Sequence, residues 1–163
     1  RSSAASDVYK RQRVGHSFIK AKMAETNAVF GGEHSAHYYF RDFWRADSGM
    51  LAAMHVLAAL GQQDKPLSEM MAKYNRYAAS GEINSRLDSA EAQADRTEAV
   101  VKAFADRAEN VDRLDGVTVE LKDGNWFNVR ASNTEPLLRL NVEADTQEAV
   151  DALVKEILAI IRA

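Results

Sequence analysis

A short polar segment of the chain combines side chains that suit the binding of a phosphate group. Residues 130–136 read Arg-Ala-Ser-Asn-Thr-Glu-Pro and stand between two stretches that we expect to be β-strands. The planar guanidinium of Arg130 can donate to two phosphate oxygens at once. Ser132, Asn133 and Thr134 can each add a donor, as can free N–H groups of the loop. A polar turn with an arginine at a strand end is the alternative without a ligand.

A second dense polar cluster reads Gly-Gly-Glu-His-Ser-Ala-His over residues 31–37 and follows the apolar stretch 28–30. Loops in such positions commonly carry ligand-binding groups. Glu33 and Ser35 are two residues apart, so they face the same way in an extended chain. A carboxylate and a hydroxyl on one side can contact neighbouring hydroxyl groups of a sugar ring. A glycine turn whose histidine bonds to the backbone is the alternative.

The same cluster also raises the question of a metal ion. Its candidate ligands are Glu33, His34, His37 and the more distant His55. His-x-x-His is not the spacing of the common zinc sites, and the chain has no cysteine to complete one. We therefore favour a sugar site and assign no metal ligand in this chain.

The composition indicates a globular protein without strong attraction to polyanions. The 163 residues are 46% hydrophobic, and 21 basic against 24 acidic residues give a net charge of −3. This balance argues against nucleic acid or an acidic membrane as a partner. The absence of cysteine fits a reducing compartment, and no apolar run approaches the roughly 20 residues that span a bilayer. We expect a cytoplasmic protein.

The chain is predicted to contain a leader and two structural units. Residues 1–12 (RSSAASDVYKRQ) lack an initiator Met and change abruptly to patterned sequence, so we interpret them as a non-native leader. Residues 13–74 are predicted to be the end of an α/β domain, with Gly15-His16-Ser17 before its first helix, where these residues could cap the helix or face an anion. Its expected elements are a helix at 17–26, strands at 28–30 and 38–43, a helix capped by Asp47, and a short helix after Pro66.

Residues 75–163 are predicted to be a small α+β domain with an antiparallel sheet and two helices in the order β-α-β-β-β-α. Asp123-Gly124 is a strong hairpin signal between alternating strands. The mixed charges at 106–115 indicate a solvated surface. The remaining expected elements are a strand at 77–84, a helix begun by Asp95 and Glu98, a strand at 138–144, and a helix begun by Asp145 and Glu148.

Three motifs, in this order and spacing, resemble one family. Gly-His-Ser at 15–17, Gly-Glu-His-Ser-Ala-His at 32–37 and Arg-Ala-Ser-Asn-Thr-Glu-Pro at 130–136 are similar to the C-terminal part of an α-D-phosphohexomutase of the phosphomannomutase/phosphoglucomutase branch. The resemblance covers residues 14–163. It implies that residues 13–74 belong to the family's third domain and residues 75–163 to its fourth.

The resemblance also implies roles for individual residues. Glu33 and Ser35 would bind sugar hydroxyls, with His37 beside them in the same loop. The phosphate that is not transferred would be held by Arg130, Ser132, Asn133 and Thr134. His16 would approach the active centre and is the one candidate catalytic residue. His34 and Ala36 depart from the Glu-Met-Ser-Gly-His of many relatives, and Ala restricts a left-handed backbone. Asn133, where the glucosamine-phosphate branch has Gly, favours a neutral hexose.

The reaction implied by the family is a two-step phosphoryl exchange. A phosphoserine donates to hexose 1-phosphate or 6-phosphate, the hexose 1,6-bisphosphate turns around, and the other phosphate returns to serine. The chain has no matching serine loop and no Asp-x-Asp-x-Asp loop for Mg²⁺. We therefore expect it to be inactive without the N-terminal domains of the same protein. A non-catalytic sugar-phosphate-binding module and, with less support, an RNA-binding α+β domain are the alternatives.

Overall fold

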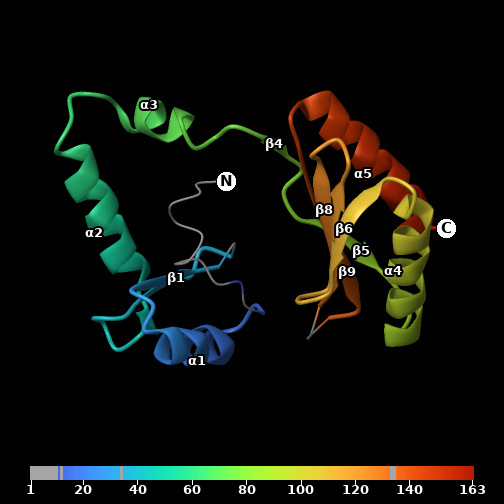
Figure 1. The fold of residues 1–163 in the computed structure, drawn as a ribbon, viewed down its shortest axis with the longest axis horizontal. Helices are drawn as coiled ribbons and strands as arrows, with labels where there is room; N and C mark the ends of the chain where they lie inside the picture. Colours follow the sequence, from blue (N-terminus) through green and yellow to red (C-terminus); the bar gives the residue numbers. More distant parts are fainter. Residues whose placement is uncertain (1–10, 12, 34, 133–134) are drawn as a thin grey trace. The chain divides into compact units, whose positions relative to one another are not determined.

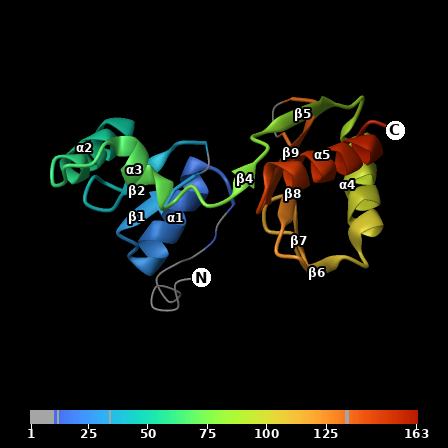
Figure 2. The ribbon, with the colours of Figure 1, turned by 90° about the horizontal axis from the view of Figure 1, so that it is seen from above.

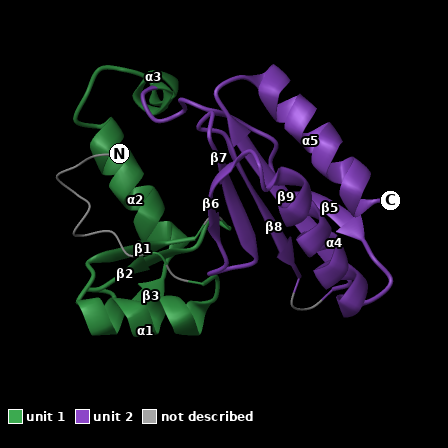
Figure 3. Ribbon diagram, turned by 45° about the vertical axis from the view of Figure 1, so that its right-hand side comes forward, with its two compact units in different colours: residues 1–72 green, residues 73–163 purple. Residues whose placement is uncertain are grey.

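A computed structural model describes residues 11, 13–33, 35–132 and 135–163. The chain divides into two compact units, residues 1–72 and 73–163 (Figure 3). This division falls two residues before the boundary that the sequence predicted. Apart from Arg11, the predicted leader lies outside the described residues. Among the helices that the structure describes, none is both long and apolar enough to cross a membrane.

Unit 1 combines a small antiparallel sheet, in the order β1-β2-β3, with helices (Figure 1). Its elements are α1 (His16–Thr26), β1 (Phe30–Gly32), β2 (Tyr38–Phe40), β3 (Ala46–Asp47), α2 (Gly49–Leu60) and α3 (Leu67–Ala72). Ile19 and Met23 of α1 are buried against Tyr39 of β2. This small core fixes α1 on the sheet, and both ends of the polar loop between β1 and β2 are therefore held in place.

Several boundaries in unit 1 differ from prediction. The Gly-Gly pair, expected to end the first strand, belongs to β1, where Gly31 pairs with Tyr39. A Cβ on Gly31 would lie 3.0 Å from side-chain atoms of both Ile19 and Met23, so glycine lets α1 approach the strand. The prediction that Asp47 caps α2 is wrong. Ser48 is the cap, and its hydroxyl accepts a hydrogen bond from the Leu51 N–H at 3.2 Å.

Unit 2 is a two-layer α+β structure, which confirms the predicted antiparallel sheet with two helices. The sheet has the order β4-β9-β8-β7-β6, and β5 also pairs with β9. Figures 1 and 2 show α4 and α5 on the same side of this sheet. The elements are β4 (Ala78–Ala79), β5 (Ile83–Arg86), α4 (Ala90–Phe104), β6 (Ala108–Asp112), β7 (Val117–Leu121), β8 (Trp126–Ala131), β9 (Leu137–Ala144) and α5 (Gln147–Ile161).

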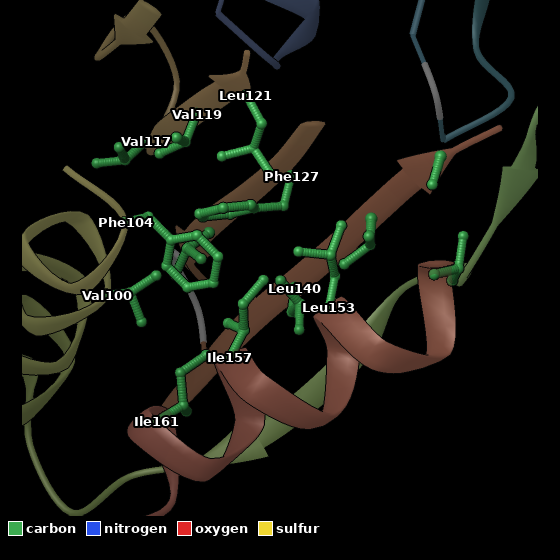
Figure 4. Close-up of a cluster of buried hydrophobic side chains, with 14 of the residues drawn as sticks. Val100, Phe104, Val117, Val119, Leu121, Phe127, Leu140, Leu153, Ile157 and Ile161 are labelled. Atoms are coloured by element: carbon green, nitrogen blue, oxygen red, sulfur yellow. The ribbon is translucent and has the colours of Figure 1, made fainter. Parts of the chain in front are cut away.

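The core of unit 2 lies between the sheet and its helices (Figure 4). Alternate residues of the central strands face it, as in β9, where every second residue from Leu138 to Ala144 is buried. α5 contributes Leu153, Ile157 and Ile161 at helical spacing. The opposite face of the sheet carries intervening side chains such as Asn128, Arg130 and Arg139, and the candidate phosphate loop follows the end of β8.

Several predictions for unit 2 are wrong. The last helix, predicted to be begun by Asp145, is capped by Thr146, whose hydroxyl accepts from the Ala149 N–H at 3.2 Å. The helix predicted to start at Asp95 begins at Ala90, because the Ser89 hydroxyl caps it by accepting from the Ala92 N–H. The strand predicted at 77–84 is split into β4 and β5. The charged stretch 106–115 is mostly exposed, as a solvated surface should be, but it contains a strand, β6, which pairs with β7 and which the predicted order omits. The order is therefore β-β-α-β-β-β-β-α.

The backbone of Gly116 lies close to the backbone of Val129 in unit 2, and a substitution tests how much this close approach contributes to stability. Its φ is +67°, and an added Cβ would lie 2.5 Å from the carbonyl oxygen of Val129. We expect Gly116→Ala to lower the free energy of unfolding by about 2 kcal/mol or more, because a left-handed non-glycine residue alone costs about 1–2 kcal/mol. Chemical denaturation followed by circular dichroism measures the change.

The matched control is Gly81→Ala, because Gly81 has φ +65° and an added Cβ would meet no described atom within 4 Å. This variant should carry the backbone cost alone. Equal losses in the two variants would show that the approach of Val129 to residue 116 has no energetic consequence.

Candidate functional site

The polar loop of unit 1 is organised around the carboxylate of Glu33. Its Oε1 accepts a hydrogen bond from the Gly15 N–H at 2.8 Å, and its Oε2 accepts from the hydroxyl of Tyr39. The Glu33 N–H donates to the carbonyl of His37 at 2.9 Å, which closes the loop. Glu33 therefore joins the Gly-His-Ser segment to the loop, so two motifs that are far apart in sequence form one site.

Ala36 stands where many relatives have glycine, and its φ of +64° lies in the left-handed region that favours glycine. Its N–H donates to the Glu33 carbonyl at 3.1 Å, so the tight turn persists with alanine. Ser35 is exposed in the same loop, and His34 lies outside the described residues.

His16 and His37 meet beside this carboxylate, and Asp47 joins them. The two imidazole centroids are 4.8 Å apart in an edge-to-face arrangement. Nδ1 of His37 lies 2.7 Å from Oδ2 of Asp47, whose Oδ1 accepts from the Tyr38 N–H at 2.8 Å. Asp47, expected to cap a helix, instead orients a predicted site residue.

Charge and burial shift the pKa values of two groups in this site. The pKa of Asp47 lies below its ordinary value, because the His37 side chain and the Tyr38 N–H both bond to its carboxylate. The pKa of the Tyr39 hydroxyl is raised by burial, then by its hydrogen bond to Glu33 and the negative charges of Glu33 and Asp47. The negative charges of Glu33 and Asp47 thus both act on the one buried ring of Tyr39.

The metal set considered from the sequence does not form in the described structure. His55 lies in α2 and stacks on Phe40, with ring centroids 5.4 Å apart. Of the three candidates that the structure describes, Glu33, His37 and His55, the cluster of imidazoles and carboxylate described above contains His37, and His34 lies outside the described residues. The cluster was missed because Asp47 reaches it only through the pairing of β2 with β3, where Tyr39 faces Asp47.

The second candidate site lies in unit 2, at the end of β8. Arg130 is partly buried, and its Nε is 3.9 Å from Oδ2 of Asp115. The Ser132 hydroxyl accepts from the Glu135 N–H at 3.3 Å, and the Ser132 N–H donates to the Leu137 carbonyl at 2.8 Å. Asn133 and Thr134 lie outside the described residues. The loop therefore begins and ends on fixed strand positions.

The structure adds Arg139 to this site. Arg139 of β9 pairs directly with Arg130 of β8, so both guanidinium groups project from the face opposite the core. Arg139 also approaches the Ser132 hydroxyl at 3.5 Å, and its buried Nε has no hydrogen-bond partner among the described residues. Like charges at paired positions destabilise a sheet. The carboxylates of Asp115, Glu82 and Glu135 lie 3.5–3.9 Å from the two guanidinium groups and offset part of this repulsion, and a bound anion would offset more of it.

Arg139 was absent from the sequence-based site because it was counted only as a polar position of an alternating strand. The alternation of apolar and polar residues in this strand could have indicated the position of Arg139. Leu138 and Leu140 are buried, so Arg139 must face the same side as Arg130 once the two strands pair.

The chain matches two models of one family. Residues 4–77 match the phosphoglucomutase/phosphomannomutase alpha/beta/alpha domain III, and residues 82–160 match the C-terminal domain of the same family. The protein therefore belongs to the phosphoglucomutase/phosphomannomutase family, with an α/β domain III portion followed by domain IV. The first match begins at residue 4, and the interpretation of residues 1–12 as a leader stays a prediction.

Relatives and a solved structure agree with this family. A phosphomannomutase of Salmonella montevideo is 42% identical over 162 residues, which is 98% of this chain and 34% of the relative. One from Methanocaldococcus jannaschii is 41% identical over 93% of this chain and 32% of the relative. A family protein from Burkholderia thailandensis has a TM-score of 0.72 at 27% identity, over 93% of this chain and 32% of that structure. The chain thus spans about a third of these proteins.

Proposed function

We propose that the protein interconverts hexose 1-phosphates and hexose 6-phosphates, and that this chain binds the sugar hydroxyls and the phosphate that is not transferred. The observation that carries the proposal is the pairing of Arg130 with Arg139 beside the Ser132 hydroxyl. Two arginines on the sheet face opposite the core, with a serine and a loop beside them, suit a phosphate dianion. The names of the relatives support a hexose as the rest of the ligand.

The sugar end of the substrate is assigned to the loop of Glu33. Each Glu33 oxygen accepts one hydrogen bond from the protein and retains a lone pair for a hydroxyl donor. The Gly15 N–H and the Tyr39 hydroxyl fix the carboxylate, so little side-chain entropy is lost when a sugar binds. Ser35 and His37 complete this set, and Asp47 orients the His37 ring.

The phosphate end is assigned to Arg130, Ser132 and Arg139, together with Asn133 and Thr134 of the same loop. Phosphoryl transfer depends mainly on positioning and on stabilising charge, so binding groups at both ends of the substrate contribute to catalysis. His16 remains the candidate catalytic residue of this chain. The phosphoserine, which would pass its phosphoryl group through a hexose 1,6-bisphosphate, is expected in sequence upstream of the chain.

The Mg²⁺ expected of the intact enzyme does not fit the residues described here. Mg²⁺ prefers an octahedral set of oxygen ligands and keeps several waters. The one described group of three possible ligands contains two imidazoles and a single carboxylate. That the intact enzyme binds Mg²⁺ outside this chain stays an expectation.

The proposal is tested with the intact protein and its Glu33→Gln variant. Phosphorus NMR should show mannose 1-phosphate or glucose 1-phosphate converted to the 6-phosphate when hexose 1,6-bisphosphate is supplied. Glu33→Gln should raise KM about tenfold or more, because losing a charge-assisted hydrogen bond costs about 1.5–3 kcal/mol. The matched control is Glu109→Gln on the exposed strand β6, which should retain the original KM. Binding without turnover by the intact protein would favour a non-catalytic sugar-phosphate-binding module.

A further inference from the structure

We propose that His16, His37 and Asp47 bind a transition-metal dication of the Zn²⁺ type. One possible ligand atom from each residue lies within 4.8 Å of the others. Two imidazoles and one carboxylate form a donor set that suits zinc and its neighbours in the first transition series. The inference goes beyond the proposed function, which assigns no metal ion to this chain.

The three side chains are close to the geometry of a zinc site. Zinc–nitrogen and zinc–oxygen bonds are about 2.0–2.2 Å long, so two ligand atoms on a tetrahedral ion are about 3.3–3.6 Å apart, and ligand atoms up to 4.8 Å apart here must close by about 1 Å. His37 Nδ1 and Asp47 Oδ2 are 2.7 Å apart and need to open slightly to admit an ion in place of the shared proton. His16 is exposed, so a rotation of its side chain can close the remaining gap.

Two of the ligands are already held in position. Asp47 accepts from the Tyr38 N–H at 2.8 Å through the oxygen that does not face His37. This bond leaves the other oxygen directed at the imidazole, and such supporting hydrogen bonds orient metal ligands and raise their affinity. The backbone of His37 is held in the loop, because its carbonyl accepts a hydrogen bond from the Glu33 N–H at 2.9 Å. The ion would therefore bind to a partly formed site at a small cost in side-chain entropy.

The surroundings favour a cation. The carboxylates of Glu33 and Asp47 both act on the buried Tyr39 ring, which also lies edge-to-face with His16 at 5.4 Å. A dication bound to the two imidazoles would balance part of the negative charge of these carboxylates. Three protein ligands leave a fourth position of a tetrahedral ion for water or another small ligand.

The metal site would also affect catalysis, and this consequence rests on the proposed function, whereas the site itself does not. His37 and Glu33 belong to the loop that we assign to the sugar hydroxyls. An ion held by His37 would therefore compete with hexose phosphate. Micromolar Zn²⁺ would then inhibit the intact enzyme in a manner that excess substrate relieves.

The test is titration of the 163-residue chain with Zn²⁺ alone, by calorimetry, and with Co²⁺ alone, by visible absorption. Single variants His16→Gln, His37→Gln and Asp47→Asn should each bind Zn²⁺ at least about tenfold more weakly, because each removes a ligand. Asp47→Asn keeps an oxygen for the Tyr38 N–H. The matched control is His55→Gln, which removes an exposed imidazole outside the cluster and should leave the Zn²⁺ affinity unchanged.

The same measurements can overturn the inference. Unchanged Zn²⁺ affinity in the three cluster variants, or loss of binding in His55→Gln or in His34→Gln alone, would assign the ion to other residues. Circular dichroism without metal shows whether each variant is folded, and His16→Gln, at an exposed position, serves if His37→Gln is not. Sugar phosphate is absent from the titration, so failure of the metal site leaves the proposed mutase activity to be judged by its own assay.

Discussion

Replacing Phe127 by Ala is expected to lower the free energy of unfolding of unit 2 by about 3–5 kcal/mol. Phe127 has no exposed surface and stands near the middle of the sheet in β8, where it faces Val119 of β7 and Val142 of β9. Its ring packs edge-to-face on Phe104 of α4, with centroids 4.9 Å apart (Figure 4). The substitution removes this aromatic contact and leaves a cavity between the sheet and a helix.

Urea denaturation followed by circular dichroism measures this loss, and the fluorescence of neighbouring Trp126 reports on unit 2. Phe127→Leu is the matched control, because it keeps most of the volume and should cost clearly less. Val111→Ala serves as the second control, since Val111 is 38% exposed on the edge strand β6. A loss below about 1 kcal/mol in Phe127→Ala would mean that Phe127 and Phe104 do not pack as described.

The sequence predicts those elements whose two faces differ in solvent exposure. β9 and α5 have regular buried positions, so their apolar residues recur at the strand and helix periods and both were found. β6 could not be found in this way. It lies at the edge of the sheet, its central residues are exposed, and its register shifts between Ala108 and Asn110. Its stability comes from pairing with β7, which a local pattern does not record.

The candidate sites likewise divide into residues that local sequence identifies and residues that only strand pairing brings into place. Glu33, His37 and Arg130 were identified because their residue types and local spacing already suggest a ligand. Asp47 and Arg139 were missed, because each gains its place only through strand pairing. Asp47 faces Tyr39 across β2 and β3, and Arg139 faces Arg130 across β8 and β9. The pairing register of strands therefore places one residue in each site, and a local sequence pattern does not predict this register.

Replacing Arg130 by Ala should weaken binding of the substrate phosphate by about 100-fold. A bidentate arginine makes two charge-assisted hydrogen bonds, and each contributes about 1.5–3 kcal/mol, while 1.4 kcal/mol corresponds to a factor of ten. The effect is measured as the KM for mannose 1-phosphate of the intact protein. Arg130→Lys should give an intermediate value, because lysine keeps the charge without the planar fork.

Stability distinguishes loss of a ligand contact from loss of structure in the Arg130→Ala variant. Arg130 faces Arg139 across the ladder, so removing one guanidinium leaves the apolar core intact and relieves a repulsion that Glu82 and Glu135 already offset in part at Arg139. Its contact with Asp115 is long, at 3.9 Å, and contributes little. We therefore expect weaker phosphate binding with an unchanged or slightly raised free energy of unfolding. Arg113→Ala, which removes an exposed ion pair with Glu98, should leave KM unchanged. An equal KM in Arg130→Ala and the unsubstituted protein would place the phosphate elsewhere.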